Sequence, residues 1–177
     1  MKVLKSDGKV LEKNEDLSTS NFFMHSLFDM VEVFINGKLV TCNLNYFYIA
    51  YLLTTLTYSN EYKKQKLNLT GYYPDSFNDK LDATNTGYTN RKELIKESTT
   101  CELVGNLYSD LFLQDRYLLP ETDVRIRIRR APVQFSLLGN TAKAYKIEIM
   151  QATMYIRKLV ENLRRSHLDL LSKNQKA

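Results

Sequence analysis

Three arginines alternate with β-branched residues between Val124 and Arg129 of this 177-residue chain, and a fourth arginine follows at position 130. Guanidinium groups bind carboxylates and phosphates through paired hydrogen bonds, so this pattern could contact an acidic neighbouring subunit or a polyanion. No aromatic residue that could stack on bases lies between the arginines, which disfavours readout of single-stranded nucleic acid. We take Arg125, Arg127, Arg129 and Arg130 as candidate contact residues, preferably for a neighbouring subunit. An ordinary solvated strand face would have the same pattern.

Residues that could support catalysis or hold a metal do not occur at suitable spacings. His25 and His167 lie far apart, and neither has a second histidine or a cysteine at a ligand spacing. The glycines never cluster into a phosphate-binding loop. Asp110, Asp115 and Asp123 are unequally spaced, which gives no reason for their oxygens to converge. We therefore predict a protein that is not an enzyme, with no cofactor and no metal site.

Charge and cysteine content limit the compartment and the partners. The formal net charge of +5 is a mild basic excess, so weak non-specific binding of nucleic acid is possible. Cys42 and Cys101 provide neither a disulfide framework nor a metal-ligand set, and Met1 to Glu12 has no apolar run of signal-peptide length. The longest apolar stretch is far shorter than the ~20 residues that a membrane helix needs. We expect intracellular synthesis, no secretion and no membrane role.

The arginines require a strand to hold them, and the sequence predicts several. In residues 124–129 the arginines would face outward while Val124, Ile126 and Ile128 would face the core. Alternation over 31–35, the turn pair Asn36-Gly37 and a returning strand over 38–41 predict a hairpin. Further strands are expected over 2–5, 101–107 and 145–149.

Helical periodicity is confined to two regions. Between residues 46 and 58, Ile49, Leu52, Leu53 and Leu56 share one face, which predicts a short packed helix. From Ile156 onward an apolar helical set among basic residues predicts a terminal amphipathic helix. Residues 59–96 are polar and interrupted by glycine and proline, so we expect loops there. Many strands with few helices favour an antiparallel sandwich or barrel.

Several segments, in the same order, resemble the Polinton-type (Maverick-type, adintovirus-like) double jelly-roll major capsid proteins. Residues 21–40, NFFMHSLFDMVEVFINGKLV, are similar to a family motif that contains "LHSLF". YIAYLLTTLTY over 48–58 and LDAT over 81–84 are similar to the next two motifs. VGNLYSDLFLQDRYLL over 104–119 resembles "IGRLHSDIFNQDRYLL", and residues 124–130 and 145–158 resemble the two strands that follow.

The resemblance implies the fold and the domain organisation. It implies an all-β fold, an antiparallel jelly-roll β-sandwich with one short internal helix and a C-terminal helix. Residues 1–158 would form a single, incomplete N-terminal jelly roll, and residues 159–177 a basic helix or linker towards a second jelly roll. Family strands before Lys2 and the second jelly roll after Ala177 would be missing, so we expect a chain truncated at both ends.

The resemblance also implies the function. The chain would be a structural capsid protein of a Polinton-like element or virus, or a truncated or domesticated copy of one. Its location would be the virion. Its partners would be further copies, as homotrimeric capsomers in the full-length form, and a penton-type minor capsid protein. The alternative hypothesis is a basic β-rich nucleic-acid-binding module, because the arginine strand and the terminal segment are both basic.

Overall fold

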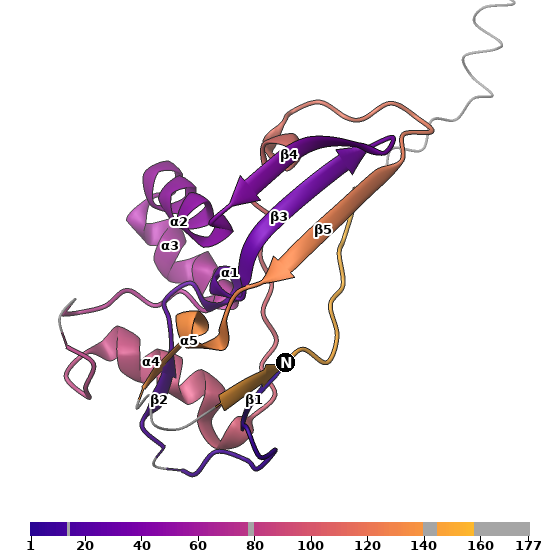
Figure 1. Ribbon diagram of the computed structural model, residues 1–177. Coiled ribbons are helices and arrows are strands. Elements are labelled where there is room, and N and C mark those ends of the chain that lie inside the picture. Colours follow the sequence, from indigo (N-terminus) through magenta and orange to yellow (C-terminus); the bar gives the residue numbers. More distant parts are fainter. Residues whose placement is uncertain (14, 78–79, 140–144, 158–177) are drawn as a thin grey trace, which may run out of the picture.

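The computed structural model describes residues 1–13, 15–77, 80–139 and 145–157 of the chain. It is a mixed α/β structure with 32% helix and 24% strand. Within these residues the strands form one three-stranded sheet and two separate two-stranded sheets. In Figure 1 the three-stranded sheet lies at one end of the molecule, and the two short strand pairs lie with helix α4 (Thr86–Ile95) at the other end.

The three-stranded sheet has the order β4–β3–β5, and its strands are Phe28–Ile35 (β3), Lys38–Leu44 (β4) and Val124–Arg130 (β5). β3 and β4 form the predicted hairpin. Asn36 and Gly37 connect them with φ angles of 48° and 78°, the positive values that a tight two-residue turn requires. β5 pairs antiparallel with the other side of β3. The central position of β3 leaves one edge of β4 and one edge of β5 open among the described residues.

The two short strand pairs are also antiparallel. β1 (Lys2–Lys5) pairs with β7 (Tyr145–Glu148), and β2 (Leu17–Thr19) pairs with β6 (Leu137–Gly139). Together with β3–β5 these pairs are nested in the sequence, with β1–β7 outermost and β3–β5 innermost. Each pair therefore joins an early segment of the chain to a late one.

The helices are mostly short. The α-helices besides α4 are α1 (Phe23–Ser26), α2 (Tyr46–Thr57), α3 (Asn60–Lys66) and α5 (Val133–Ser136). In Figure 1, α2 and α3 lie beside the three-stranded sheet. The 3-10 helices are η1 (Leu67–Thr70), η2 (Lys96–Ser98) and η3 (Asp110–Leu113). The side chains of Ser59 and Asn85 accept hydrogen bonds from the first turns of α3 and α4, which satisfies backbone donors that would otherwise have no partner.

Two hydrophobic clusters hold these elements together. The first joins the short strand pairs to α4 and contains Val3, Leu11, Leu17, Phe23, Leu27, Ile95, Leu137 and Ile147. The second lies between β3 and α2 and contains Phe22, Val31, Tyr46, Ala50, Leu67 and Tyr108. Phe22 and Phe23 are adjacent in sequence but belong to different clusters, so this dipeptide connects the two halves of the molecule.

The expected all-β jelly-roll sandwich with one short internal helix is wrong. The strands form three small sheets of two or three strands, and helix exceeds strand in the structure. Residues 59–96, expected to be loops, contain α3, η1 and α4. α3 and α4 have little apolar periodicity. Ser59 caps α3 and Asn85 caps α4, and α4 also buries Tyr88, Arg91 and Ile95, which the hydrophobic pattern does not reveal.

Other predicted elements had mixed outcomes. The strands over 2–5 and 124–129 are confirmed, and so is the helix that begins at Tyr46. Residues 101–107 form neither strand nor helix, and the strand predicted over 145–149 ends at Glu148. The predicted face of α2 is partly wrong, because Leu52 and Leu56 are 57% and 82% exposed. The segment 159–177 lies outside the described residues.

Candidate contact site

The four candidate arginines lie on β5, a strand at one edge of the three-stranded sheet (Figure 1). Its alternation fits that of β3, since Arg125 lies opposite Phe34 and Arg127 opposite Glu32. Residues that lie directly opposite each other in an antiparallel pair share a face of the sheet. The register therefore presents the arginines at 125, 127 and 129 on the same face of the sheet as Glu32.

Two of the arginines form ion pairs within the chain. Arg127 Nη1 lies 3.2 Å from Glu32 Oε2, and its guanidinium carbon is 5.2 Å from the centre of the Phe34 ring. Arg129 donates from Nε to Asp29 Oδ2 at 2.9 Å, and its Nη2 contacts the same oxygen. Both arginines remain more than half exposed, so each pair stabilises the fold only weakly.

The other two arginines differ from this pair and from each other. Arg130 donates from Nη2 to the backbone carbonyl of Ile147 at 2.8 Å, which ties β5 to β7. Arg125 is exposed and has no ion pair or hydrogen bond through its side chain with the described residues. Three arginines against two carboxylates leave this face with a net charge of about +1 by count. Its capacity for a polyanion is therefore low.

The opposite side of β5 is less buried than the sequence predicts. Ile126 is half-buried and packs against the cluster around Val31 and Tyr46. Ile128 lies opposite the buried Val31 and so on the predicted face, but it is 44% exposed, so the prediction that it is buried is wrong. Ile126 packs against the second hydrophobic cluster, whereas Ile128 belongs to neither cluster. β5 thus has an arginine face and a partly uncovered apolar face.

Breaking the internal ion pairs tests whether the arginines of β5 can bind nucleic acid. Replacing Asp29 with Asn and Glu32 with Gln frees two guanidinium groups, so duplex DNA binding should become more salt-dependent. The slope of log K against log salt should steepen by about 1.8, because each additional neutralised phosphate adds roughly 0.9 to the slope. The measurement is fluorescence anisotropy with a labelled duplex over a salt series.

A matched control separates the arginine face from net charge. Glu93→Gln with Glu97→Gln makes the same change in net charge on the α4–η2 segment. Equal slopes for the two double variants would mean that β5 has no specific part in binding.

A buried cluster of ring side chains lies between α1 and α2. His25 is fully buried, its Nδ1 is 3.0 Å from the hydroxyl oxygen of Tyr46, and that oxygen accepts a hydrogen bond from the backbone N–H of Tyr108 at 3.1 Å. The Tyr46 hydroxyl can therefore donate to Nδ1. Burial lowers the pKa of His25 to about 3 and raises the pKa of Tyr46. His25 is thus a neutral packing residue, and it lines neither of the two surface cavities described below.

A buried arginine that the sequence does not single out joins three segments. Arg91 of α4 is 2% exposed. It donates from Nε to the carbonyl of Thr19 at 3.1 Å, from Nη1 to the carbonyl of Tyr73 at 2.9 Å, and from Nη2 to Asp75 Oδ1 at 2.9 Å. Gly87 permits this approach, because a β-carbon there would lie 2.6 Å from the Pro74 carbonyl oxygen. Arg91 therefore has a structural role.

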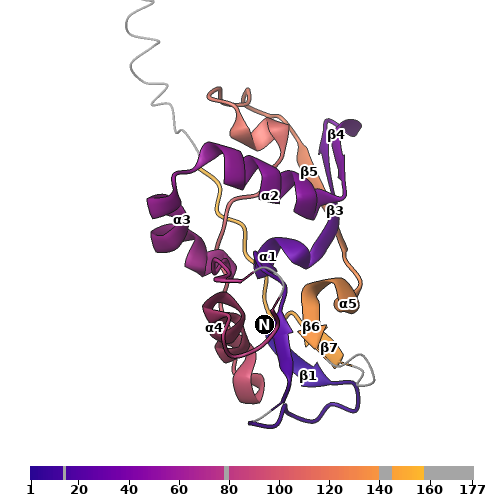
Figure 2. The same cartoon turned by 90° about the vertical axis from the view of Figure 1, so that its left-hand side faces the viewer.

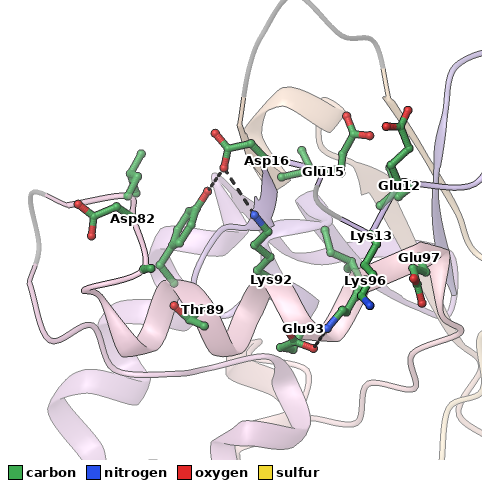
Figure 3. A pocket seen from close by; sticks show the side chains of 16 residues that line it. Glu12, Lys13, Glu15, Asp16, Asp82, Thr89, Lys92, Glu93, Lys96 and Glu97 are labelled. Carbon is green, nitrogen blue, oxygen red and sulfur yellow. Dashed lines mark hydrogen bonds and ion pairs between the residues drawn. The ribbon is translucent and has the colours of Figure 1, made fainter.

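The larger surface cavity, about 550 Å³, lies between the loop before β2 and helix α4 (Figure 3). Its charged lining residues are Glu12, Lys13, Glu15, Asp16, Asp82, Lys92, Glu93, Lys96 and Glu97. Asp16 lies 3.2 Å from the Tyr88 hydroxyl and 3.8 Å from Lys92, and Lys96 lies 3.0 Å from Glu93. Within the described residues no group of acids, histidines or cysteines could hold a metal ion. The cavity is a solvated surface of mixed charge.

The smaller cavity, about 210 Å³, is mainly aromatic. It lies between the start of β3, the start of α2 and α5, and it is lined by Phe28, Asp29, Asn45, Phe47, Tyr48, Ala131, Pro132 and Phe135. The rings of Phe47 and Phe135 pack edge to face with centroids 5.2 Å apart. The volume is below the roughly 300–1,000 Å³ of small-molecule sites, so the cavity suits one side chain better than a whole ligand.

Large apolar side chains are exposed at many places on the surface. Among the described residues, 22 large hydrophobic residues are exposed and 17 hydrophobic residues are buried. Most of the exposed ones fall in three stretches, at 39–56, 113–119 and 150–156. Of these stretches, the sequence analysis predicts packing only for the helix over 46–58, and the structure shows that Leu52 and Leu56 of this helix are exposed.

Comparisons with known proteins yield no relatives: no family model, curated protein or solved structure matches this chain. In the part of the chain that the structure describes, no helix is both long enough and apolar enough to cross a membrane.

Proposed function

We propose that this chain is a non-enzymatic structural subunit of a viral-type capsid, from a Polinton-like element or virus or a copy derived from one. In this role it acts by burying surface against neighbouring subunits. Six segments between residues 21 and 158 resemble, in order, motifs of the Polinton-type major capsid proteins, which supports this assignment. The partners would be further copies of the chain, as trimeric capsomers in a full-length form, together with a penton-type minor capsid protein.

The observation that carries the proposal is the grouping of exposed large hydrophobic residues in three stretches of the chain, 39–56, 113–119 and 150–156. A soluble monomer seldom exposes large continuous apolar surface, because water disfavours it and because it promotes association. Leu56, Leu119 and Tyr155 are each at least 80% exposed, and each has apolar neighbours in its own stretch of chain. Such a surface is expected of a subunit that is covered in its assembly.

The chemistry of the described residues also favours a structural role over an enzymatic one. The buried histidine is neutral and enclosed by Phe22, Tyr46 and Tyr108, so it has no route to a substrate. In the larger cavity Asp16, Lys92, Glu93 and Lys96 already pair with one another or with Tyr88. Neither arrangement brings a nucleophile and a base together.

Self-association should therefore depend on protein concentration. Sedimentation velocity between about 1 and 100 μM should show discrete oligomers rather than a single monomeric species, since specific interfaces of modest size dissociate in this range. Electron microscopy of the oligomeric fraction should show particles of uniform size and shape.

The Tyr155→Ser, Ile156→Ser variant provides the comparison, because it removes two highly exposed apolar side chains without touching either core cluster. It should associate more weakly than the native chain. The proposal is contradicted if the native chain stays monomeric at every concentration, or if it forms only amorphous aggregates without discrete oligomers.

A further inference from the structure

The three-stranded sheet has two open edges, and they differ in chemistry. At one edge β5 has arginines at 125, 127, 129 and 130. Two β5 strands that met edge to edge would bring like charges together, which natural edge strands use to prevent pairing. At the other edge β4 has a single charged residue, Lys38, at its first position. The β4 edge therefore lacks the charges that protect β5.

The low charge of β4 continues into the next helix. Residues 39–59 contain no charged side chain, although 25% of the whole chain is charged. Seven large apolar residues of this run are exposed, namely Leu39, Val40, Leu44, Tyr48, Tyr51, Leu52 and Leu56. Figure 2, which views the molecule from the side of β4, shows β4 beside the start of α2. An uncharged apolar surface of this kind is self-complementary, because two copies can meet on it without repulsion.

The register of β4 indicates how two copies could pair. A bulge at Val40 interrupts its pairing with β3, and Thr41 to Leu44 is regular. Thr41 and Asn43 lie opposite Val33 and Val31 on the α2 side of the sheet, and Cys42 lies opposite Glu32 on the arginine side. A two-fold axis at Cys42 would place Thr41 of each copy opposite Asn43 of the other, so that every facing pair shares a face.

We propose that two copies of this chain pair antiparallel through β4, with a two-fold axis at Cys42 that joins their sheets into one of six strands. The inference rests on the proposed structural function and names the surface that one of its subunit contacts uses. Backbone hydrogen bonds along Thr41–Leu44 give the contact its register. The exposed side chains of Leu39, Val40, Leu44 and Tyr48 supply apolar area around it.

A disulfide tests the geometry directly. Facing residues of an antiparallel pair have Cα atoms roughly 4.5–5.5 Å apart, which is within the range for a disulfide. Cys42 is an exposed free thiol and Cys101 is buried. Mild oxidation of the native chain should therefore give a covalent dimer through Cys42 in non-reducing gels and peptide mass spectra. In a Cys42→Ser background, Arg127→Cys places a thiol at the middle of the other open edge, and that variant should give at least tenfold less dimer.

A charge at the axis tests the contact without a cross-link. Cys42→Lys places an ammonium opposite Glu32 of its own chain, so folding should be preserved, while two lysines face each other across the axis. The dissociation constant from sedimentation should rise at least tenfold, and Cys42→Thr should leave it within about twofold. If Cys42→Lys associates like the native chain, or if both cysteine positions cross-link equally, the β4 contact is wrong while the proposed function stands. If the native chain never self-associates, both are wrong.

Discussion

Replacing Arg91 with methionine is expected to lower the free energy of unfolding by about 3–5 kcal/mol. Methionine has a similar length but no donor, so the carbonyls of Thr19 and Tyr73 lose their partners, and Asp75 loses the charge that compensates it. Removing one partner of a buried ion pair is costly because the other charge stays in a poorly solvated place. Urea unfolding followed by circular dichroism gives the change directly.

Two further variants separate the buried contact from general charge loss. Lys92→Met, at the next position of α4, removes an exposed pair with Asp16 at 3.8 Å and should cost less than about 1 kcal/mol. Adding Asp75→Asn to Arg91→Met should recover part of the loss, since no uncompensated carboxylate remains. If Arg91→Met and Lys92→Met are equally mild, the structural role assigned to Arg91 is wrong.

The free energy of unfolding should fall by about 2.5 kcal/mol between pH 7 and pH 4.5 because of His25 alone, at 1.36 kcal/mol per pKa unit. The folded protein holds the pKa of His25 at about 3, below the ordinary value of 6.5. Between these values the unfolded chain binds a proton that the folded chain does not. Acid therefore favours unfolding, and this destabilisation begins as the pH drops through 6.5.

The His25→Gln variant isolates this contribution from the carboxylates that titrate over the same range. Glutamine cannot take up the proton but can still hydrogen-bond to the Tyr46 hydroxyl, which now contacts Nδ1. The difference in unfolding free energy between the native chain and the variant should shrink as the pH falls. A constant difference from pH 7 to pH 4.5 would show that folding does not lower the pKa of His25.

Local patterns predict the sheet around the arginines well. The β3–β4 turn follows from Asn36-Gly37, whose residues tolerate positive φ, and β5 follows from strict alternation over 124–129. The outward orientation of the arginines follows from the same alternation. Their partners do not, because Asp29 and Glu32 lie on a strand about 95 residues away in the sequence. No local signal specifies that register.

Helices α3 and α4 were missed because they lack the apolar stripe that sequence analysis seeks. α4 buries Tyr88, Ile95 and the charged Arg91, a combination that does not resemble a core face in the sequence. The residue in the sequence that indicates the start of α4 is Asn85. It caps the helix and also donates to the carbonyls of Phe77 and Lys80. An Asx residue at the end of a polar stretch marks a helix start as well as a turn. The composition of the stretch alone suggested loops.

The nested order of the strand pairs determines how the chain can fold. Closing β1 on β7 directly would confine about 140 residues, but once β2 and β6 have paired the same closure confines only about 16. The entropic cost of closing β1 on β7 then falls by about 2 kcal/mol, because this cost grows with the logarithm of loop length. Folding should therefore proceed outward from β3–β5. On the ribosome, where about 5–20 residues are added each second, β1 must wait roughly 7–30 s for its partner strand to be made.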